Sequence, residues 1–258
     1  MGFFGKMFEK KVCAICGAEI GMLGNRKLED GNMCKACEAK LSPWFNERRS
    51  STVKQIEEQL TYREENKQAV AVFRTTRSLG KYTKVLLDED AGNFVVTSAR
   101  DLVEANPDVL SFSQVTGCEL KIEEDSTEEM TEDKDGRSVS YNPPRYTYSY
   151  DFDIMIRVNH PYFDEISFRL NSSSVETTNG IAVPANRKPI PTRSMEYKEY
   201  ARIGQEIKEI LTTGWQKARE KEIAAAAPKV TINCPYCGAP TIPDDAGCCE
   251  YCGSALEV

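Results

Sequence analysis

Eight of the ten cysteines in this chain form four Cys-x-x-Cys pairs, two near each end of the sequence. A pair with that spacing turns tightly, so both thiolates can reach one ion, and two pairs complete a four-sulfur site. Such a site is tetrahedral and favours Zn²⁺. The sequence therefore predicts two zinc ions per chain, one held by Cys13, Cys16, Cys34 and Cys37, the other by Cys234, Cys237, Cys249 and Cys252.

The pairing of the cysteines also predicts the compartment. No stretch resembles a secretory signal, so we expect thiolates on metal in a reducing cytoplasm rather than disulfides. Two cysteines are left over. Cys118 lies in an apolar run and is expected to be a small buried side chain. Cys248 adjoins Cys249, but only Cys249 keeps the two-residue gap to Cys252, so Cys249 is the expected ligand.

The charge of the chain argues against a general nucleic-acid binder. Its formal net charge is −7, and two four-thiolate sites would take it to about −11, whereas phosphate binding needs a basic surface. The charge is uneven, however. Residues 1–54 hold ten Lys and Arg against six Asp and Glu, while residues 119–135 hold nine acidic residues against two lysines. The basic N-terminal region therefore keeps a nucleic-acid role open as an alternative.

The centre of the chain alternates between apolar and polar residues, which predicts antiparallel strands. The clearest strand is 146–158, where every second residue is apolar or aromatic, and the turn before 166–170 predicts a hairpin. Shorter strands are expected at 81–87, 94–97, 109–115 and 118–122. Residues 123–144 are acidic and poor in apolar side chains, which predicts a mobile, solvated loop.

Two helices are expected on either side of these strands. Thr52 and Gln55 match a capping box, which predicts a largely solvated helix over about residues 53–67. Ser194 can cap a second helix over 195–221, whose apolar stripe should pack on the sheet. The chain is thus expected to be α+β, with a four-cysteine zinc finger (1–42), a linker helix (43–77), an antiparallel β body with a closing helix (78–221), a linker (222–229) and a zinc ribbon (230–258).

Three parts of the chain resemble known families. The first 41 residues, with Cys-x-x-Cys-Gly, Ile20-Gly21, Asp30-Gly31 and the second cysteine pair, resemble a small four-cysteine finger that opens a family of bacterial proteins of unassigned function. The last 25 residues are similar to the zinc ribbons that end many bacterial proteins. The order of strands and closing helix in the centre resembles the pleckstrin-homology or GRAM arrangement. The first resemblance implies metal binding and an interaction role.

The sequence offers little for catalysis. Two four-cysteine sites leave no open coordination position for a substrate. His160, the only histidine, precedes Pro161 in a turn and is expected to be a surface residue. No Walker or Rossmann glycine pattern occurs. We therefore predict no enzymatic activity, no catalytic residue and no bound cofactor besides zinc.

The predicted function is a cytoplasmic zinc-binding adaptor that engages a protein partner, with membrane contact through the apolar, basic segment Met1–Lys10 as a further option. Within the ribbon, four side chains either cover the metal or contact the partner: Tyr236, Pro240, Ile242 and Tyr251. Two alternatives remain. One is a nucleic-acid-associated regulator that uses the basic finger. The other is an iron redox module, because Cys234-Pro-Tyr-Cys237-Gly238 resembles a rubredoxin hook, although the eleven residues between Cys237 and Cys249 are few for that family.

Overall fold

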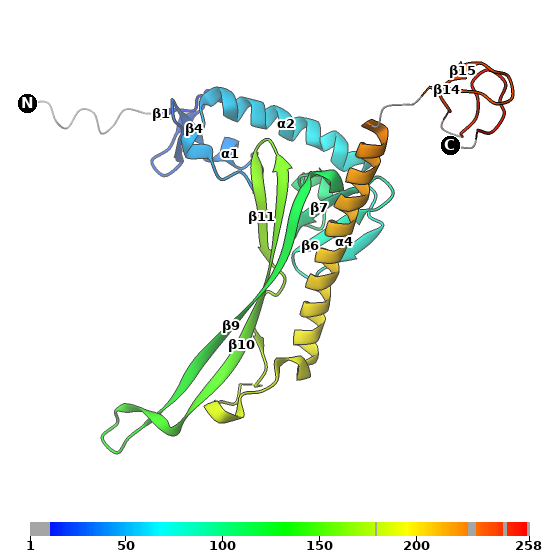
Figure 1. Cartoon of the computed structure of the whole chain (residues 1–258). Helices are drawn as coiled ribbons and strands as arrows, with labels where there is room; N and C mark the ends of the chain where they lie inside the picture. The colour runs from blue at the N-terminus through cyan, green and yellow to red at the C-terminus, as the bar shows by residue number, and fades with distance from the viewer. Residues whose placement is uncertain (1–10, 179, 227–230, 245–246, 257–258) are drawn as a thin grey trace, which may run out of the picture. The chain divides into compact units, whose positions relative to one another are not determined.

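The computed structural model describes residues 11–178, 180–226, 231–244 and 247–256 (Figure 1). It confirms an α+β protein built from helices and antiparallel sheets. The chain divides into two compact units, Met1–Gln216 and Lys217–Val258. The segment Met1–Lys10, where membrane contact is a further option, lies outside the described residues.

The N-terminal finger is two short hairpins followed by one helical turn. Its elements are β1 (Lys11–Val12), β2 (Glu19–Ile20), β3 (Asn25–Lys27), β4 (Asn32–Cys34) and α1 (Lys35–Glu38). β1 pairs with β2 and β3 with β4, both antiparallel. Its small core holds Leu28, Met33 and Leu41, together with Ile56 from the helix that follows. A core this small needs help from a metal to stay folded.

Helix α2 (Val53–Val72) corrects the expectation of a largely solvated linker. The capping box is confirmed: the Gln55 backbone N–H donates to the Thr52 hydroxyl, and the Thr52 N–H donates to the Gln55 side chain. The helix buries a whole face, however: Ile56, Gln59, Arg63, Asn66 and Val70. Most of those side chains are polar, and they pack against partners distant in sequence, so no apolar stripe indicated the burial.

The first sheet of the body has four antiparallel strands in the order β5-β6-β7-β8. They are β5 (Arg77–Leu79), β6 (Lys84–Asp88), β7 (Asn93–Thr97) and β8 (Leu110–Ser111), with the short helix α3 (Leu102–Ala105) between the last two. The turn predicted between residues 88 and 92 joins β6 to β7. Phe94 and Leu87 face the core and are fully buried.

The second sheet is organised around one long strand, β10 (Ser138–His160). β9 (Val115–Glu132) pairs with one edge of it, and the other edge pairs with β11 (Phe163–Arg169), β12 (Val175–Glu176) and β13 (Val183–Pro184). The hairpin predicted from the alternating pattern is confirmed, since Ile156 lies opposite Ile166 and Ile154 opposite Phe168.

The prediction of a mobile loop over residues 123–144 is wrong. Residues up to Glu132 continue β9 and pair with β10, for example Glu124 with Tyr150 and Glu129 with Arg145, so the segment is a twisted two-stranded ribbon (Figure 1). Only a short turn, 133–137, lies between the two strands. Backbone hydrogen bonds to the neighbouring strand need no apolar side chain, so a composition typical of a solvated loop is compatible with a solvated ribbon.

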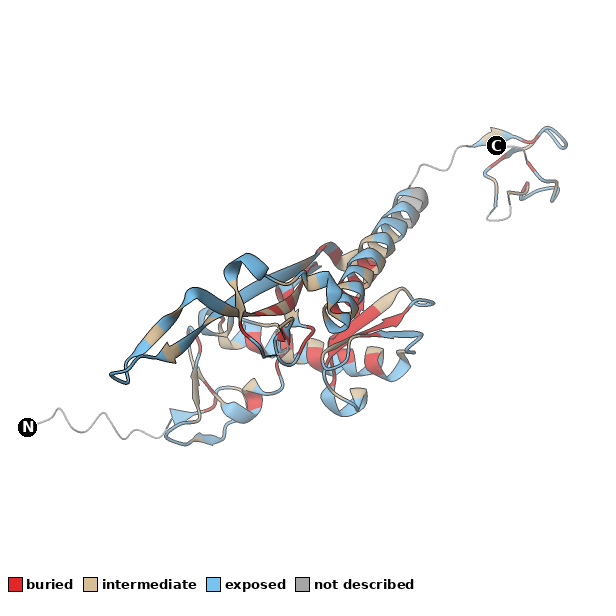
Figure 2. Ribbon diagram, turned by 90° about the horizontal axis from the view of Figure 1, so that it is seen from below, coloured by how far each residue is buried: buried red, intermediate tan, exposed pale blue. Residues whose placement is uncertain are grey.

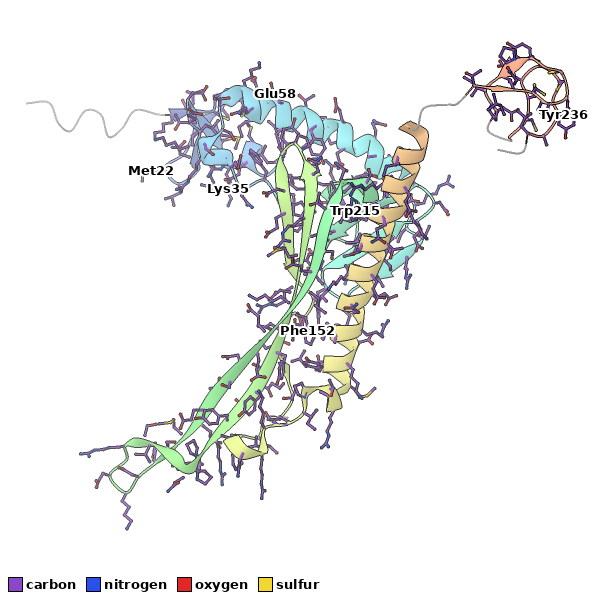
Figure 3. The ribbon with its side chains drawn as sticks, viewed as in Figure 1. Met22, Lys35, Glu58, Phe152, Trp215 and Tyr236 are labelled. Atoms are coloured by element: carbon purple, nitrogen blue, oxygen red, sulfur yellow. The ribbon has the colours of Figure 1, made fainter. Side chains whose placement is uncertain are left out.

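Helix α4 (Met195–Ala226) closes the body. The Tyr197 N–H donates to the Ser194 hydroxyl (3.3 Å), as the capping prediction required. Tyr200, Ile203, Ile207 and Leu211 are buried against the sheets, where Phe152 lies at the centre of the core (Figure 3); Figure 2 shows the buried residues along the strands and the inner side of this helix. The helix extends to Ala226, past its expected end at 221, so the linker expected at 222–229 is helical up to that residue, and 227–230 lie outside the described residues.

Two glycines, Gly204 and Gly214, let α4 approach the body closely. We expect different effects on stability when each is replaced by alanine. A Cβ at Gly214 would lie 2.9 Å from the ring of Phe112, which is 8% exposed and stacked on Phe94. A Cβ at Gly204 would lie closer still, 2.6 Å from a terminal methyl of Leu120, but that side chain is flexible and only partly buried, so it can move aside. Alanine gains about 1 kcal/mol of helix propensity at either position, but overpacking against a fixed ring costs about 1–3 kcal/mol.

We therefore expect Gly214→Ala to lower the midpoint of thermal unfolding, and Gly204→Ala to leave it unchanged or raise it slightly. Calorimetry on the two variants checks this, and each serves as the control for the other. A stabilised Gly214→Ala variant would show that the Phe112 ring yields easily.

Candidate metal centres

The four N-terminal cysteines come together around a common point. The Sγ atoms of Cys13 and Cys37 are 3.9 Å apart, those of Cys16 and Cys34 3.8 Å, and all four lie within 4.8 Å of one another. Tetrahedral zinc with Zn–S bonds of about 2.3 Å separates its sulfurs by about 3.8 Å, whereas a disulfide holds them at about 2.05 Å. The geometry therefore fits a metal ion and excludes bonded sulfur pairs.

The two N-terminal Cys-x-x-Cys turns, or hooks, are built differently. Cys13 to Cys16 form a turn in which the Gly17 N–H donates to the Cys13 carbonyl (2.9 Å), and Gly17 has φ = +72°, which glycine adopts without strain. Cys34 ends β4 and also caps α1, because its Sγ accepts a hydrogen bond from the Cys37 N–H (3.4 Å). The first hook is thus a loop and the second is the start of a helix.

Backbone donors around this group favour thiolates. Burial by itself would raise the pKa of Cys13, but N–H groups of Cys16, Cys34 and Ile15 outweigh it and lower that pKa to about 6. The contact from Cys34 N–H to Cys13 Sγ is 3.3 Å. Burial and the neighbouring sulfurs raise the pKa of Cys37 instead. One thiolate is therefore already present near neutral pH to receive a cation, which then draws the remaining protons off.

In the C-terminal group both hooks have the same turn geometry. Cys234 and Cys252 have Sγ atoms 3.6 Å apart, and those of Cys237 and Cys249 are 3.7 Å apart. In each hook the glycine that follows, Gly238 or Gly253, donates its N–H to the carbonyl of the first cysteine (2.8 Å) with φ near +70°. β14 (Ile232–Asn233) and β15 (Pro240–Thr241) flank the first hook. The Ser254 hydroxyl and N–H lower the pKa of Cys252 to about 6.

Cys249 and Cys248 can now be compared directly. Cys249 is 1% exposed and its Sγ belongs to the four-sulfur group, whereas the Cys248 Sγ does not. The Cys248 backbone N–H donates to Asp244 (2.7 Å), which keeps its backbone in the turn. The structure thus brings together the eight cysteines chosen from the sequence, as two groups that can each hold a metal ion.

We expect Cys249→Ser to reduce the bound metal from two ions per chain to one, and Cys248→Ser to leave it at two, because serine oxygen is a poor replacement for a thiolate ligand of zinc. Elemental analysis of the two purified proteins measures this. Loss of an ion from the Cys248→Ser protein would show that Cys248, and not Cys249, is the ligand.

The other residues singled out from the sequence lie elsewhere. Cys118 is buried, as predicted, and burial raises its pKa to about 12. His160 is half-buried rather than on the surface: its ring stacks on Phe163 (4.1 Å between centroids) and meets the edge of Tyr62 (4.9 Å). Burial lowers the pKa of His160, so its imidazole is neutral at pH 7.

A buried carboxylate that sequence reasoning missed ties the finger to the body. Asp108, with a side chain that is 0% exposed, accepts hydrogen bonds from Arg63 (2.6 Å), Tyr62 (2.9 Å) and Ser42 (2.8 Å). Burial and the neighbouring carboxylate of Asp108 raise the pKa of Tyr62, so its hydroxyl stays protonated and can donate the hydrogen bond to Asp108. The partners lie more than forty residues apart in sequence, and no local pattern links them.

Fold and sulfur geometry define an α+β protein with a four-cysteine metal-binding group near each end. Residues 11–59 match the family described as a domain of unknown function, DUF4428. No curated protein and no solved structure matches the chain, so the pleckstrin-homology or GRAM resemblance gains no support there. Among the described residues, no helix combines the length and apolar character needed to cross a membrane.

The matched region ends inside α2, and the start of this helix is attached to the finger. The Asp30 carboxylate accepts the Val53 N–H (2.8 Å) at the start of α2, and a Cβ on Gly31 would lie 2.8 Å from the Val53 side chain. The Asp-Gly pair noted in the sequence therefore seats this helix on the finger. The finger and the first turns of α2 form one folding unit.

Proposed function

We propose that this protein is a non-catalytic zinc-binding adaptor that recognises a protein partner, and that zinc holds the end modules in shape. The metal assignment follows from donor chemistry: four thiolates in tetrahedral geometry favour zinc or iron, and closed sites of this kind are structural for zinc. Metal analysis of the purified protein tests it. Two zinc ions in a colourless protein are expected, whereas a red, iron-containing protein would favour electron transfer.

The observation that carries the interaction role is the exposure of the ribbon's aromatic residues. Tyr236 (labelled in Figure 3) and Tyr251 occupy the same position in the two C-terminal hooks, and they are 70% and 68% exposed. Ile242 is also exposed, at 39%. The small core of the ribbon consists of Cys234, Cys249 and Leu256, with Ile232 packed against it, and neither tyrosine belongs to that core. Exposed tyrosines on a rigid turn are typical anchors of protein interfaces.

The charges of the finger support a protein partner over nucleic acid. Arg26 and Arg48 both pair with Glu38, the second at 3.0 Å, so part of the basic excess is neutralised within the finger itself. A phosphate-binding surface needs Lys and Arg side chains that are free to neutralise phosphates and so displace the counterions of the nucleic acid.

Partner capture from the native cell tests the proposal. The full chain and a Tyr236→Ser/Tyr251→Ser variant are compared by crosslinking and purification, with zinc content measured for both. The variant should retain two zinc ions and lose the partner that the natural chain retrieves. Retrieval of the same protein at undiminished yield would remove these tyrosines as the contact, and binding to duplex DNA that falls steeply with salt would favour the nucleic-acid alternative.

A further inference from the structure

A cavity of about 540 Å³ lies between α2, the segment that follows the finger, and the turn joining β10 to β11. The tip of the β10–β11 hairpin lies beneath α2 (Figure 1). The volume is within the range of about 300–1,000 Å³ that small ligand sites occupy. All of its lining belongs to the first compact unit.

Five of the twelve residues that line this cavity carry aromatic rings, and most of the others are polar. Trp44 and Phe45 form one side, and His160, Tyr162 and Phe163 form the other. The second side is a packed stack, since Tyr62 behind it contacts both His160 (4.9 Å) and Tyr162 (5.2 Å). The aromatic residues of the lining thus come from two segments that are distant in sequence, 44–45 and 160–163.

One buried carboxylate holds both walls in place. Asp108 accepts the Tyr62 hydroxyl (2.9 Å), which supports the His160 side. It also accepts the Ser42 hydroxyl (2.8 Å), and the Ser42 oxygen in turn accepts the Trp44 N–H (3.1 Å). Trp44 packs against the core of the body and Phe45 against the core of the finger. The cavity is therefore preorganised, which lowers the entropic cost of binding.

The charge of the lining has a single sign. Three carboxylates line the cavity, those of Glu47, Glu58 and Asp164, and neither lysine nor arginine lines it. Glu58, on α2 (Figure 3), has one basic neighbour, Lys54, at 3.8 Å, but that side chain is 85% exposed and the contact is weak. No ion pair joins Glu47 or Asp164 to another described residue. His160 is neutral at pH 7 because burial lowers its pKa.

We infer that this cavity binds the basic side chain of a peptide, with the guanidinium group of an arginine as the preferred occupant. Aromatic faces attract a cation through the ring quadrupole, and carboxylates at the rim pair with it. Arginine combines both, because its planar group stacks on rings and bonds carboxylates in a fork. Its lining residues belong to a different compact unit from Tyr236 and Tyr251, so failure of this test would leave the proposed function standing.

The test uses the zinc-loaded full chain and two matched peptides. A blocked Gly-Arg-Gly peptide is titrated against Gly-citrulline-Gly, which has nearly the same shape without the charge, and choline is titrated against its neutral isostere 3,3-dimethylbutan-1-ol. Trp44 fluorescence in a Trp215→Phe background reports binding, and calorimetry gives the affinity. Binding of the arginine peptide is expected, with the citrulline peptide weaker by about tenfold.

Variants of the exposed carboxylates distinguish binding at this cavity from a general attraction of the basic peptide to an acidic protein. Glu58→Gln/Asp164→Asn should weaken the arginine peptide by about tenfold. Glu57→Gln, on the same helix but outside the cavity lining, should leave its affinity unchanged. All of these positions are solvent-exposed, so the variants are expected to fold, and circular dichroism confirms it.

Equal binding of the arginine and citrulline peptides, or binding of neither, would overturn the inference. So would equal weakening by Glu57→Gln and by the double variant. Binding of choline without the arginine peptide would overturn the peptide assignment and identify the cavity as a site for a free organic cation.

Discussion

Replacing Cys13 with serine should release one of the two metal ions and unfold the finger while the β body stays folded. Metal binding contributes on the order of 10–16 kcal/mol to small four-ligand modules. The finger has little else to hold it, since its core is Leu28, Met33, Leu41 and the metal-facing sulfurs, closed by Ile56. This is the largest effect expected of any single substitution in the chain.

The unfolding should also reach into α2, but only part of the way. The first turns of α2, 53–60, pack on the finger, whereas Arg63 and Asn66 are held by Asp108 and the adjoining residues 106–109. Hydrogen exchange should therefore rise over residues 11–60 and stay low beyond Arg63. Cys249→Ser is the reciprocal control, because it should release the other ion without raising exchange in the finger. A Cys13→Ser protein that keeps two ions, or one whose finger remains protected, would contradict the prediction.

Replacing Arg63 with methionine should cost about 3–5 kcal/mol of stability, because it leaves the buried Asp108 carboxylate without its cation. The Arg63 side chain is 7% exposed and that of Asp108 0%. Arg63 also donates to the Asn106 carbonyl and to the Lys40 carbonyl (3.3 Å), so three segments lose a partner at once. Urea unfolding of the natural and variant chains measures the difference.

The matched control is Lys67→Met, one helical turn further along α2. Lys67 pairs with Glu64 in solvent, with side chains 54% and 67% exposed, and such pairs contribute about 0–1 kcal/mol. If the two variants are equally stable, the Arg63–Asp108 pair contributes no more than a surface contact. In that case the finger would be coupled to the body by apolar packing alone.

This coupling changes how the proposed adaptor would work. The finger was expected to be a separate module joined to the body by a solvated helix. Instead Ser42 from the end of the finger, Tyr62 and Arg63 from α2, and Asp108 from the body share one buried network. A partner that binds near this junction therefore meets a fixed arrangement of finger and body, which favours recognition by shape over recognition by a mobile arm.

The sequence by itself determined the features whose information is local. The cysteine ligands could be chosen because two-residue gaps place thiolates in one turn, and the α2 start could be placed because Thr52 and Gln55 cap each other three residues apart. The strand around Phe152 could be predicted because every second residue is apolar, and the apolar stripe of α4 because apolar residues recur every three to four positions. Such periods arise directly from the burial of one face of a strand or helix.

Only the tertiary structure decided the features that depend on distant partners. The acidic segment that begins at Glu123 forms a strand because β10 supplies its hydrogen-bond partners, and its own side chains stay in solvent whether or not it is paired. The polar face of α2 is buried at Arg63 and Asn66 because Asp108 and Asn106, forty or more residues away, satisfy these two side chains. A hydrogen bond between distant residues leaves no periodic trace in the chain, whereas burial of an apolar face does.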